Sequence, residues 1–206
     1  MSDVKEGVLE CNGLTIRYAE SGEGRPVVVF PASAGALFDD VAAALAMQHR
    51  VIVLDVPASG LGKIQDFAEH LAPSLAGLGV APFSVIGVSR GATPALAQAV
   101  YTPEQVHRLV LLSPPLASVQ NPEWGARLRE VRAPTLVLVG TRDRSGSREA
   151  GHICREQIPS CHLLLVYDAG HAIAVDRREA CLSPIGEFLE QGEGFIVFHE
   201  SQMIRP

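Results

Sequence analysis

Short apolar runs alternate along the chain with longer stretches that mix apolar and polar residues. Runs of this kind are typical of strands that are buried on both faces of a parallel sheet. They are Val27–Phe30, Arg50–Val56, Phe83–Gly87, Arg108–Leu112, Thr135–Gly140 and His162–Tyr167. The stretches between them predict helices at Ala36–Met47, Ile64–Leu78, Ala92–Tyr101, Ser147–Ile158 and Arg177–Gln191. This alternation predicts an α/β protein with a mostly parallel sheet and helices on both faces.

The N-terminal segment follows a different pattern. Val8–Glu20 predicts two short strands around Asn12-Gly13, a dipeptide that favours a tight hairpin turn. With this antiparallel pair, about eight strands are expected. No repeat or long linker divides the chain, so residues 1–206 are interpreted as a single domain, with 193–206 as a C-terminal extension. The apolar run Phe195–Phe198 in that extension could add an edge strand or meet another protomer, but packing on the parent domain is favoured.

Composition narrows the class of protein. Of the 206 residues, 47% are hydrophobic and 19% are charged, which excludes a disordered chain. The net charge of −6 excludes a basic footprint for nucleic acid or an anionic membrane. The first ten residues include four charged side chains, so a secretory signal is not expected. No apolar run approaches the length of a membrane helix. We expect a cytoplasmic protein, monomeric or homodimeric.

One motif follows a predicted strand directly. Residues 87–91 read GVSRG, which fits the nucleophile-elbow pattern G-x-S-x-G. The pattern alone is weak, but here it lies between an apolar strand and a helix rich in small residues. A nucleophile elbow needs this strand–turn–helix context, because the tight turn strains the serine backbone and leaves little room around it. Ser89 is therefore the candidate nucleophile, and an ordinary turn serine is the alternative.

A nucleophilic serine needs a base, and the base needs an acid that orients it. In doubly wound sheets the chemistry gathers at the carboxyl ends of the strands. Asp143 and His171 each follow a later predicted strand, in the expected order of serine, acid and histidine. Asp168 and Asp176 are rival candidates for the acid.

Metal and cofactor signatures are not found in the sequence. The four cysteines form no C-x-x-C pair, and free thiols are expected. No histidine stands in an H-E-x-x-H motif, and the six besides His171 are expected at the surface or as capping groups. We therefore expect neither a metal nor a cofactor.

Four segments together resemble the α/β-hydrolase fold superfamily. They are GVSRG at 87–91, GTRD at 140–143, AGH at 169–171 and LDVPASG at 54–60. The resemblance covers about residues 7–192. It implies that Ser89 is the nucleophile, Asp143 the acid and His171 the base. It also implies an oxyanion hole formed by the backbone N–H groups of Ser33 and Arg90.

The chain departs from the family pattern at two places. Pro31-Ala32 replaces the usual His-Gly after the third strand, in the loop that supplies one oxyanion donor. Only Ser113–Arg132 stands where many members insert a cap. This predicts a small, cap-less enzyme with an open site. Trp124, the single tryptophan, is expected to form a hydrophobic wall for a short or medium acyl chain.

The resemblance implies a serine hydrolase that cleaves a carboxylic ester or thioester through an acyl-enzyme. Its expected partner is a small-molecule acyl substrate, with no nucleic acid and no membrane. The same residues are compatible with a Ser/His lyase or an acyltransferase. A non-catalytic ligand-binding protein on the same fold is a further alternative.

Overall fold

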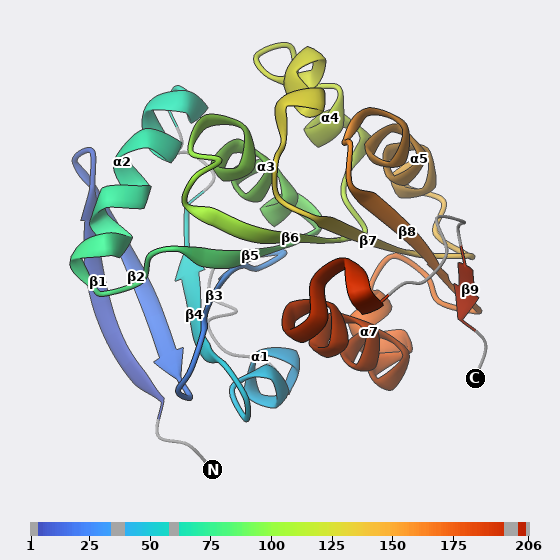
Figure 1. Cartoon of the computed structure of the whole chain (residues 1–206), viewed down its shortest axis with the longest axis horizontal. Helices are drawn as coiled ribbons and strands as arrows, with labels where there is room; N and C mark the ends of the chain where they lie inside the picture. The colour runs from blue at the N-terminus through green and yellow to red at the C-terminus, as the bar shows by residue number, and fades with distance from the viewer. Residues whose placement is uncertain (1–3, 34–39, 58–61, 196–201, 205–206) are drawn as a thin grey trace.

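A computed structural model describes residues 4–33, 40–57, 62–195 and 202–204. The described strands form one sheet in the order β1-β2-β4-β3-β5-β6-β7-β8-β9 (Figure 1). Their bounds are β1 Lys5–Cys11, β2 Leu14–Ser21, β3 Pro26–Phe30, β4 Arg50–Asp55, β5 Phe83–Val88, β6 Val106–Leu112, β7 Thr135–Gly140, β8 Cys161–Val166 and β9 Gln202–Ile204. The β1–β2 hairpin is antiparallel, β2 is antiparallel to β4, and the later pairs are parallel. The predicted mostly parallel sheet with an N-terminal hairpin is confirmed.

Helices cover both faces of the sheet (Figure 1). One face carries α2 (Ile64–Gly77), α3 (Ala92–Tyr101) and α5 (Ser147–Gln157), and the other carries α1 (Asp40–Leu45) and α7 (Arg178–Gln191). Each face has its own hydrophobic core, and successive strand residues alternate between the two cores. In β4, for example, Ile52 packs into the first core and Val53 into the second. Burial on both faces explains why these strands read as continuous apolar runs.

The strand order brings loops that are far apart in the sequence together at the carboxyl ends of the parallel strands. Strand β3 pairs in parallel with β5, and Phe30 at the end of β3 lies opposite Gly87. The loop that begins at Pro31 therefore starts beside the elbow at Ser89. Strands β6, β7 and β8 follow on the other side of β5, so the loops after β7 and β8 open at the same edge. This arrangement gathers the predicted site residues at one end of the sheet.

The C-terminal extension contains an edge strand, which was one of the alternatives to packing on the parent domain. Strand β9 pairs in parallel with β8, with Met203 opposite Leu165. The extension thus adds a strand to the sheet next to β8. Residues 196–198 of the predicted apolar run lie outside the described residues. Residues 36–39, where a helix was predicted to begin, lie outside them as well, and α1 is described from Asp40.

The connection between β6 and β7 is short and folded against the domain. It contains the four-residue helix α4 (Leu116–Val119) and the 3-10 helix η3 (Gly125–Glu130). Val119 and Leu128 from these two elements are both buried in the core beside α3 and α5. The connection therefore forms part of the domain's own layer, as expected for a fold without a cap.

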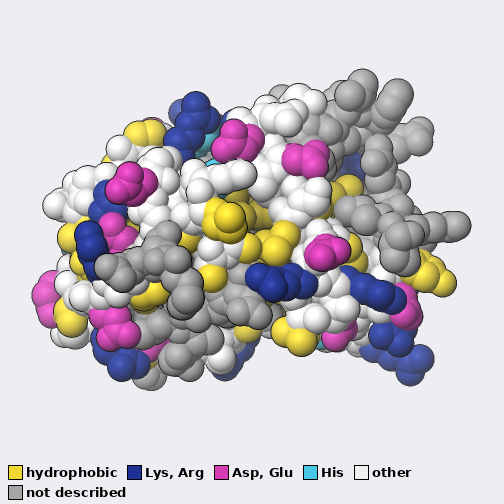
Figure 2. Space-filling view, turned by 90° about the horizontal axis from the view of Figure 1, so that it is seen from below, with side chains coloured by type: hydrophobic (Ala, Val, Ile, Leu, Met, Phe, Trp, Pro, Cys, Tyr) yellow, Lys and Arg dark blue, Asp and Glu magenta, His cyan; other side chains and the backbone are white. Residues whose placement is uncertain are grey.

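The surface carries charges of both signs. On the face shown in Figure 2, the described lysine and arginine side chains lie among aspartates and glutamates rather than in one field. Across the described residues, no helix combines the length and the apolar character needed to cross a membrane.

Candidate active site

Ser89 lies at a strained turn between β5 and α3. Its φ of 48° is in the left-handed region, which a serine rarely adopts. The turn leaves no room for side chains at its two glycines. A Cβ on Gly87 would lie 2.7 Å from Cα of Ala92, and one on Gly91 would meet the carbonyl oxygen of Phe30. These close approaches explain the two glycines of the G-x-S-x-G pattern.

Ser89, His171 and Asp143 form a chain of hydrogen bonds, although 82 residues separate the first two in the sequence. Ser89 Oγ lies 2.8 Å from Nε2 of His171. Nδ1 of His171 lies 2.9 Å from Oδ2 of Asp143. The side chain of Asp143 is 1% exposed and that of His171 is 42% exposed. The structure thus brings the three predicted residues together, with the acid buried and the histidine open to a ligand.

The hydrogen bonds also assign the proton on the imidazole. Burial raises the pKa of Asp143. Hydrogen bonds from the Ser145 hydroxyl, the Ser145 N–H, His171 and the Ser147 hydroxyl outweigh that effect and hold the pKa below its ordinary value of 3.8. An ionised Asp143 can only accept, so Nδ1 of His171 carries the proton and donates it. Nε2 is then left free to accept the hydroxyl proton of Ser89.

Two further serines surround the acid, and the sequence reading did not single them out. The N–H of Ser145 donates to Oδ1 of Asp143 over 2.7 Å. The hydroxyl of Ser145 lies 3.1 Å from Nδ1 of His171 and 3.0 Å from the hydroxyl of Ser147. Ser147 is fully buried at the start of α5. Two serines within four residues of an acid candidate are a pattern that could have indicated these hydrogen bonds.

The rival acids have other partners. Asp168 forms ion pairs with Arg177 at 2.7 Å and with Arg142 at 3.1 Å. Asp176 accepts the N–H of Gly170, the residue before His171, over 2.7 Å. Both aspartates therefore hold the loop that carries His171, and Asp143 is the one bonded to the imidazole.

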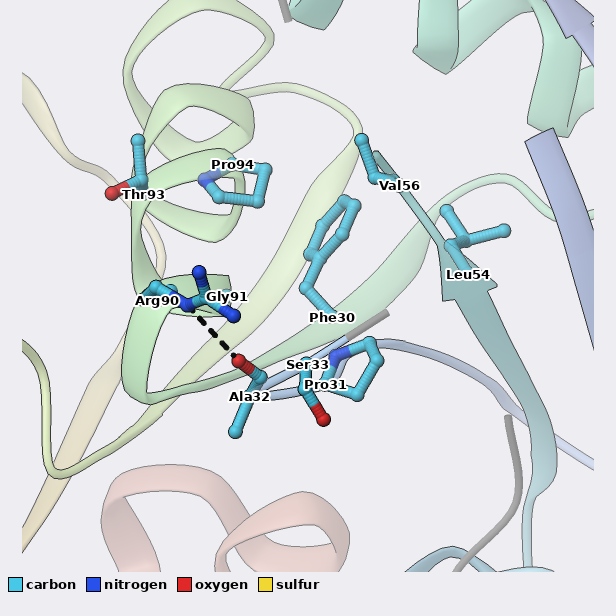
Figure 3. A pocket seen from close by; sticks show the side chains of 10 residues that line it. All are labelled: Phe30, Pro31, Ala32, Ser33, Leu54, Val56, Arg90, Gly91, Thr93 and Pro94. Atoms are coloured by element: carbon cyan, nitrogen blue, oxygen red, sulfur yellow. Dashed lines mark hydrogen bonds between the residues drawn. The ribbon is translucent and has the colours of Figure 1, made fainter. Parts of the chain in front are cut away.

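The predicted oxyanion donors line a common cavity. Ser33 and Arg90 both border a cavity of about 250 Å³ beside the elbow (Figure 3). Nε of Arg90 donates to the carbonyl oxygen of Ala32 over 3.3 Å, which ties the loop after β3 to the elbow. This hydrogen bond holds Pro31-Ala32 next to Arg90. Pro31 itself has no N–H to donate to an oxyanion.

The predicted role of Trp124 is corrected by its burial. Its side chain is 1% exposed and lies in the hydrophobic core. The indole Nε1–H donates to the carbonyl oxygen of Ser118 over 3.1 Å. Trp124 therefore anchors the connection after β6 from inside, and it presents no surface to a ligand.

The four cysteines and two of the other histidines lie in the interior of the domain. All four cysteines are free, as predicted, and all are buried. Burial raises the pKa of Cys154 and of Cys181 to about 12. The other six histidines were predicted at the surface or as capping groups, and His49 and His162 do not lie at the surface, because both are buried. Within the described ranges, no group of three or more His, Cys, Asp or Glu side chains could hold a metal ion.

Comparison with models of known families identifies the family of the chain. The model of the α/β-hydrolase fold family matches residues 25–131, which is about half of the chain and includes the elbow. The chain belongs to the α/β-hydrolase fold family. The matched segment ends before Asp143 and His171, so the positions of these two residues rest on the geometry above. A search of curated proteins finds no significant match.

Solved α/β-hydrolase structures resemble the chain over most of its length. A serine hydrolase involved in carbazole degradation superposes with a TM-score of 0.75 at 18% identity, covering 91% of this chain and 99% of that one. Naproxen esterase from Bacillus subtilis gives 0.73 at 16%, covering 91% and 92%. A membrane phospholipase A gives 0.70 at 21%, covering 91% and 86%. At these identities the likeness supports the fold.

Proposed function

We propose that this α/β-hydrolase is a serine hydrolase that cleaves a carboxylic ester or thioester. The observation that carries the proposal is the hydrogen-bonded chain from Ser89 through His171 to a buried, ionised Asp143. A serine at an ordinary turn would not need a strained φ, two glycines without room for a Cβ, and a histidine within 2.8 Å of its hydroxyl. These features together match the requirements of an activated nucleophile.

The first half of the reaction acylates Ser89. Nε2 of His171 takes the hydroxyl proton while Oγ of Ser89 attacks the carbonyl carbon. Asp143 stabilises the imidazolium that forms and keeps Nδ1 protonated. The tetrahedral intermediate collapses as His171 returns its proton to the leaving alcohol or thiol. An acyl-enzyme on Ser89 is the product of this step.

The second half releases the acid. Water gives a proton to Nε2 of His171 and attacks the acyl carbon, and the imidazolium then protonates Oγ of Ser89. In both halves the negative oxygen is held by the N–H groups of Ser33 and Arg90. Loss of one such donor typically costs about 2.7–4 kcal/mol of transition-state stabilisation. No cofactor takes part in this scheme.

Turnover of p-nitrophenyl acetate and of an acetyl thioester tests the proposal. The wild type should hydrolyse at least one of them, and Ser89→Ala should abolish that activity. Ser183→Ala is the matched control, because Ser183 is an exposed serine on α7 whose hydroxyl bonds to Glu187. A wild type inactive on both substrates would favour the non-catalytic alternative. Acyl transfer to an added alcohol in preference to water would favour the acyltransferase.

A further inference from the structure

The cavity beside the elbow is lined mainly by apolar residues, with the polar side chains of Ser33, Arg90 and Thr93 among them (Figure 3). Its lining residues come from the end of β3 and its loop, the end of β4, and the elbow with the start of α3. They are Phe30, Pro31, Ala32, Ser33, Leu54, Val56, Arg90, Gly91, Thr93 and Pro94. Phe30 and Leu54 are almost fully buried, and Val56 is half-buried. In Figure 3, Leu54 and Val56 lie across the cavity from Arg90 and Gly91, with Phe30 between them.

We propose that this cavity is the acyl subsite and that it accepts an unbranched aliphatic acyl chain of medium length. The inference rests on the proposed function, because it needs an acyl group on Ser89. The hydrophobic wall of the site then lies at the ends of β3 and β4. It does not lie in the connection after β6, where Trp124 is buried.

The positions of the reacting groups distinguish the acyl side from the leaving-group side. The leaving group must lie against His171, because Nε2 protonates it. In the proposed reaction the carbonyl oxygen faces the N–H groups of Ser33 and Arg90, and both residues line the cavity. Of the described residues that line the cavity, none comes from the loops of Asp143 or His171. An acyl chain that lies in the cavity therefore extends from the carbonyl carbon in the direction away from the leaving group.

The size and chemistry of the cavity limit the chain. A cavity of about 150 Å³ lined by apolar side chains holds a benzene molecule, so 250 Å³ has room for roughly six to ten carbon atoms. Phe30, Leu54, Val56 and Pro94 offer no hydrogen-bonding side chain to a polar tail. Each methylene that becomes buried there should raise kcat/KM by up to about fourfold. The gain should end at about ten carbons, where the cavity is full.

Two lining variants and one control test the subsite with p-nitrophenyl esters of increasing acyl length. Val56→Phe fills the cavity, so kcat/KM for the octanoate should fall about tenfold or more while the acetate changes less than about twofold. Leu54→Ala enlarges the cavity, so the length at which the gain ends should increase. Val8→Phe places the same substitution on an exposed position of β1 and should leave the profile unchanged. Opposite shifts in the two lining variants cannot arise from general loss of folding.

A second ester series separates the possible failures. Acetates of lengthening alcohols vary the leaving group alone, and Val56→Phe should not alter their profile. If it alters the alcohol series and not the acyl series, the cavity holds the leaving group and the proposal is overturned. Equal profiles for Val56→Phe and Val8→Phe on active enzyme would overturn it as well. A wild type that neither hydrolyses any ester nor reacts with a fluorophosphonate at Ser89 would overturn the proposed function and the subsite together.

Discussion

The assignment of Asp143 as the acid leads to a quantitative expectation for Asp143→Asn. In the wild type, Oδ1 of Asp143 accepts the Ser145 N–H and Oδ2 accepts Nδ1–H of His171. An asparagine would keep its oxygen toward the Ser145 N–H and turn its NH₂ group toward Nδ1. His171 would then have to accept at Nδ1 and carry its proton on Nε2. That tautomer cannot take the hydroxyl proton of Ser89.

The expected loss is large, because the acid is buried. The Asp143 side chain is 1% exposed, so water does not replace its charge beside the imidazolium. The same change in a Ser-His-Asp enzyme lowers kcat by about 10⁴-fold, which corresponds to about 5.4 kcal/mol at about 1.36 kcal/mol per tenfold. We expect a loss of this order in kcat for p-nitrophenyl acetate, with KM little changed.

Asp168→Asn is the matched control. It removes two ion pairs whose partners are partly exposed, and such pairs contribute about 0–1 kcal/mol each to stability. Its kcat should stay within about twofold of the wild type, since Asp168 does not contact the imidazole. If Asp143→Asn kept more than about a tenth of the activity, or if Asp168→Asn lost more than Asp143→Asn, the assignment of the acid would be refuted.

Three further predictions concern Trp124 in the core, Ser145 beside the imidazole, and unfolding in acid. Trp124→Ala should lower the free energy of unfolding in urea by about 3–5 kcal/mol, and a raised KM with unchanged stability would instead show contact with substrate. Ser145→Ala should lower kcat about tenfold with KM unchanged, because it removes only the hydroxyl beside the imidazole. Ser145→Thr keeps a hydroxyl and should restore kcat. An equal loss of kcat in both variants would point to a structural effect. Because the pKa of Asp143 is lowered on folding, its contribution to stability is present above pH 3.8 and is lost as the pH falls through its folded-state pKa, so acid unfolding should depend less on pH in Asp143→Asn.

The sequence predicted much of the fold because the sheet is buried on both faces. Each strand from β3 to β8 appears in the sequence as a separate apolar run, and the Asn12-Gly13 turn marks the hairpin. The order of Ser89, Asp143 and His171 after their strands was also readable, since parallel strands place such residues at one edge. The short strand β9 was harder to predict, because its pairing with β8 depends on a tertiary contact.

The details of the site depend on side-chain directions, which sequence order does not contain. Asp143 and Asp168 both come after strands, and only the structure shows that one meets the imidazole while the other meets Arg142 and Arg177. Trp124 was wrongly predicted to form a wall of the substrate site, because a lone tryptophan in a connection can face either a ligand or the core. The cavity was not predicted, since it joins the ends of β3 and β4 to the start of α3.

Labelling with a fluorophosphonate, followed by peptide mass mapping, tests whether Ser89 is an activated nucleophile. The reagent reacts only with a serine whose proton a base removes, so it reports activation of Ser89 without knowledge of the substrate. We expect one adduct on Ser89, slow or absent labelling in His171→Ala, and normal labelling in Ser183→Ala. An unlabelled Ser89 in the folded wild type, or an adduct rate unchanged in His171→Ala, would contradict this expectation.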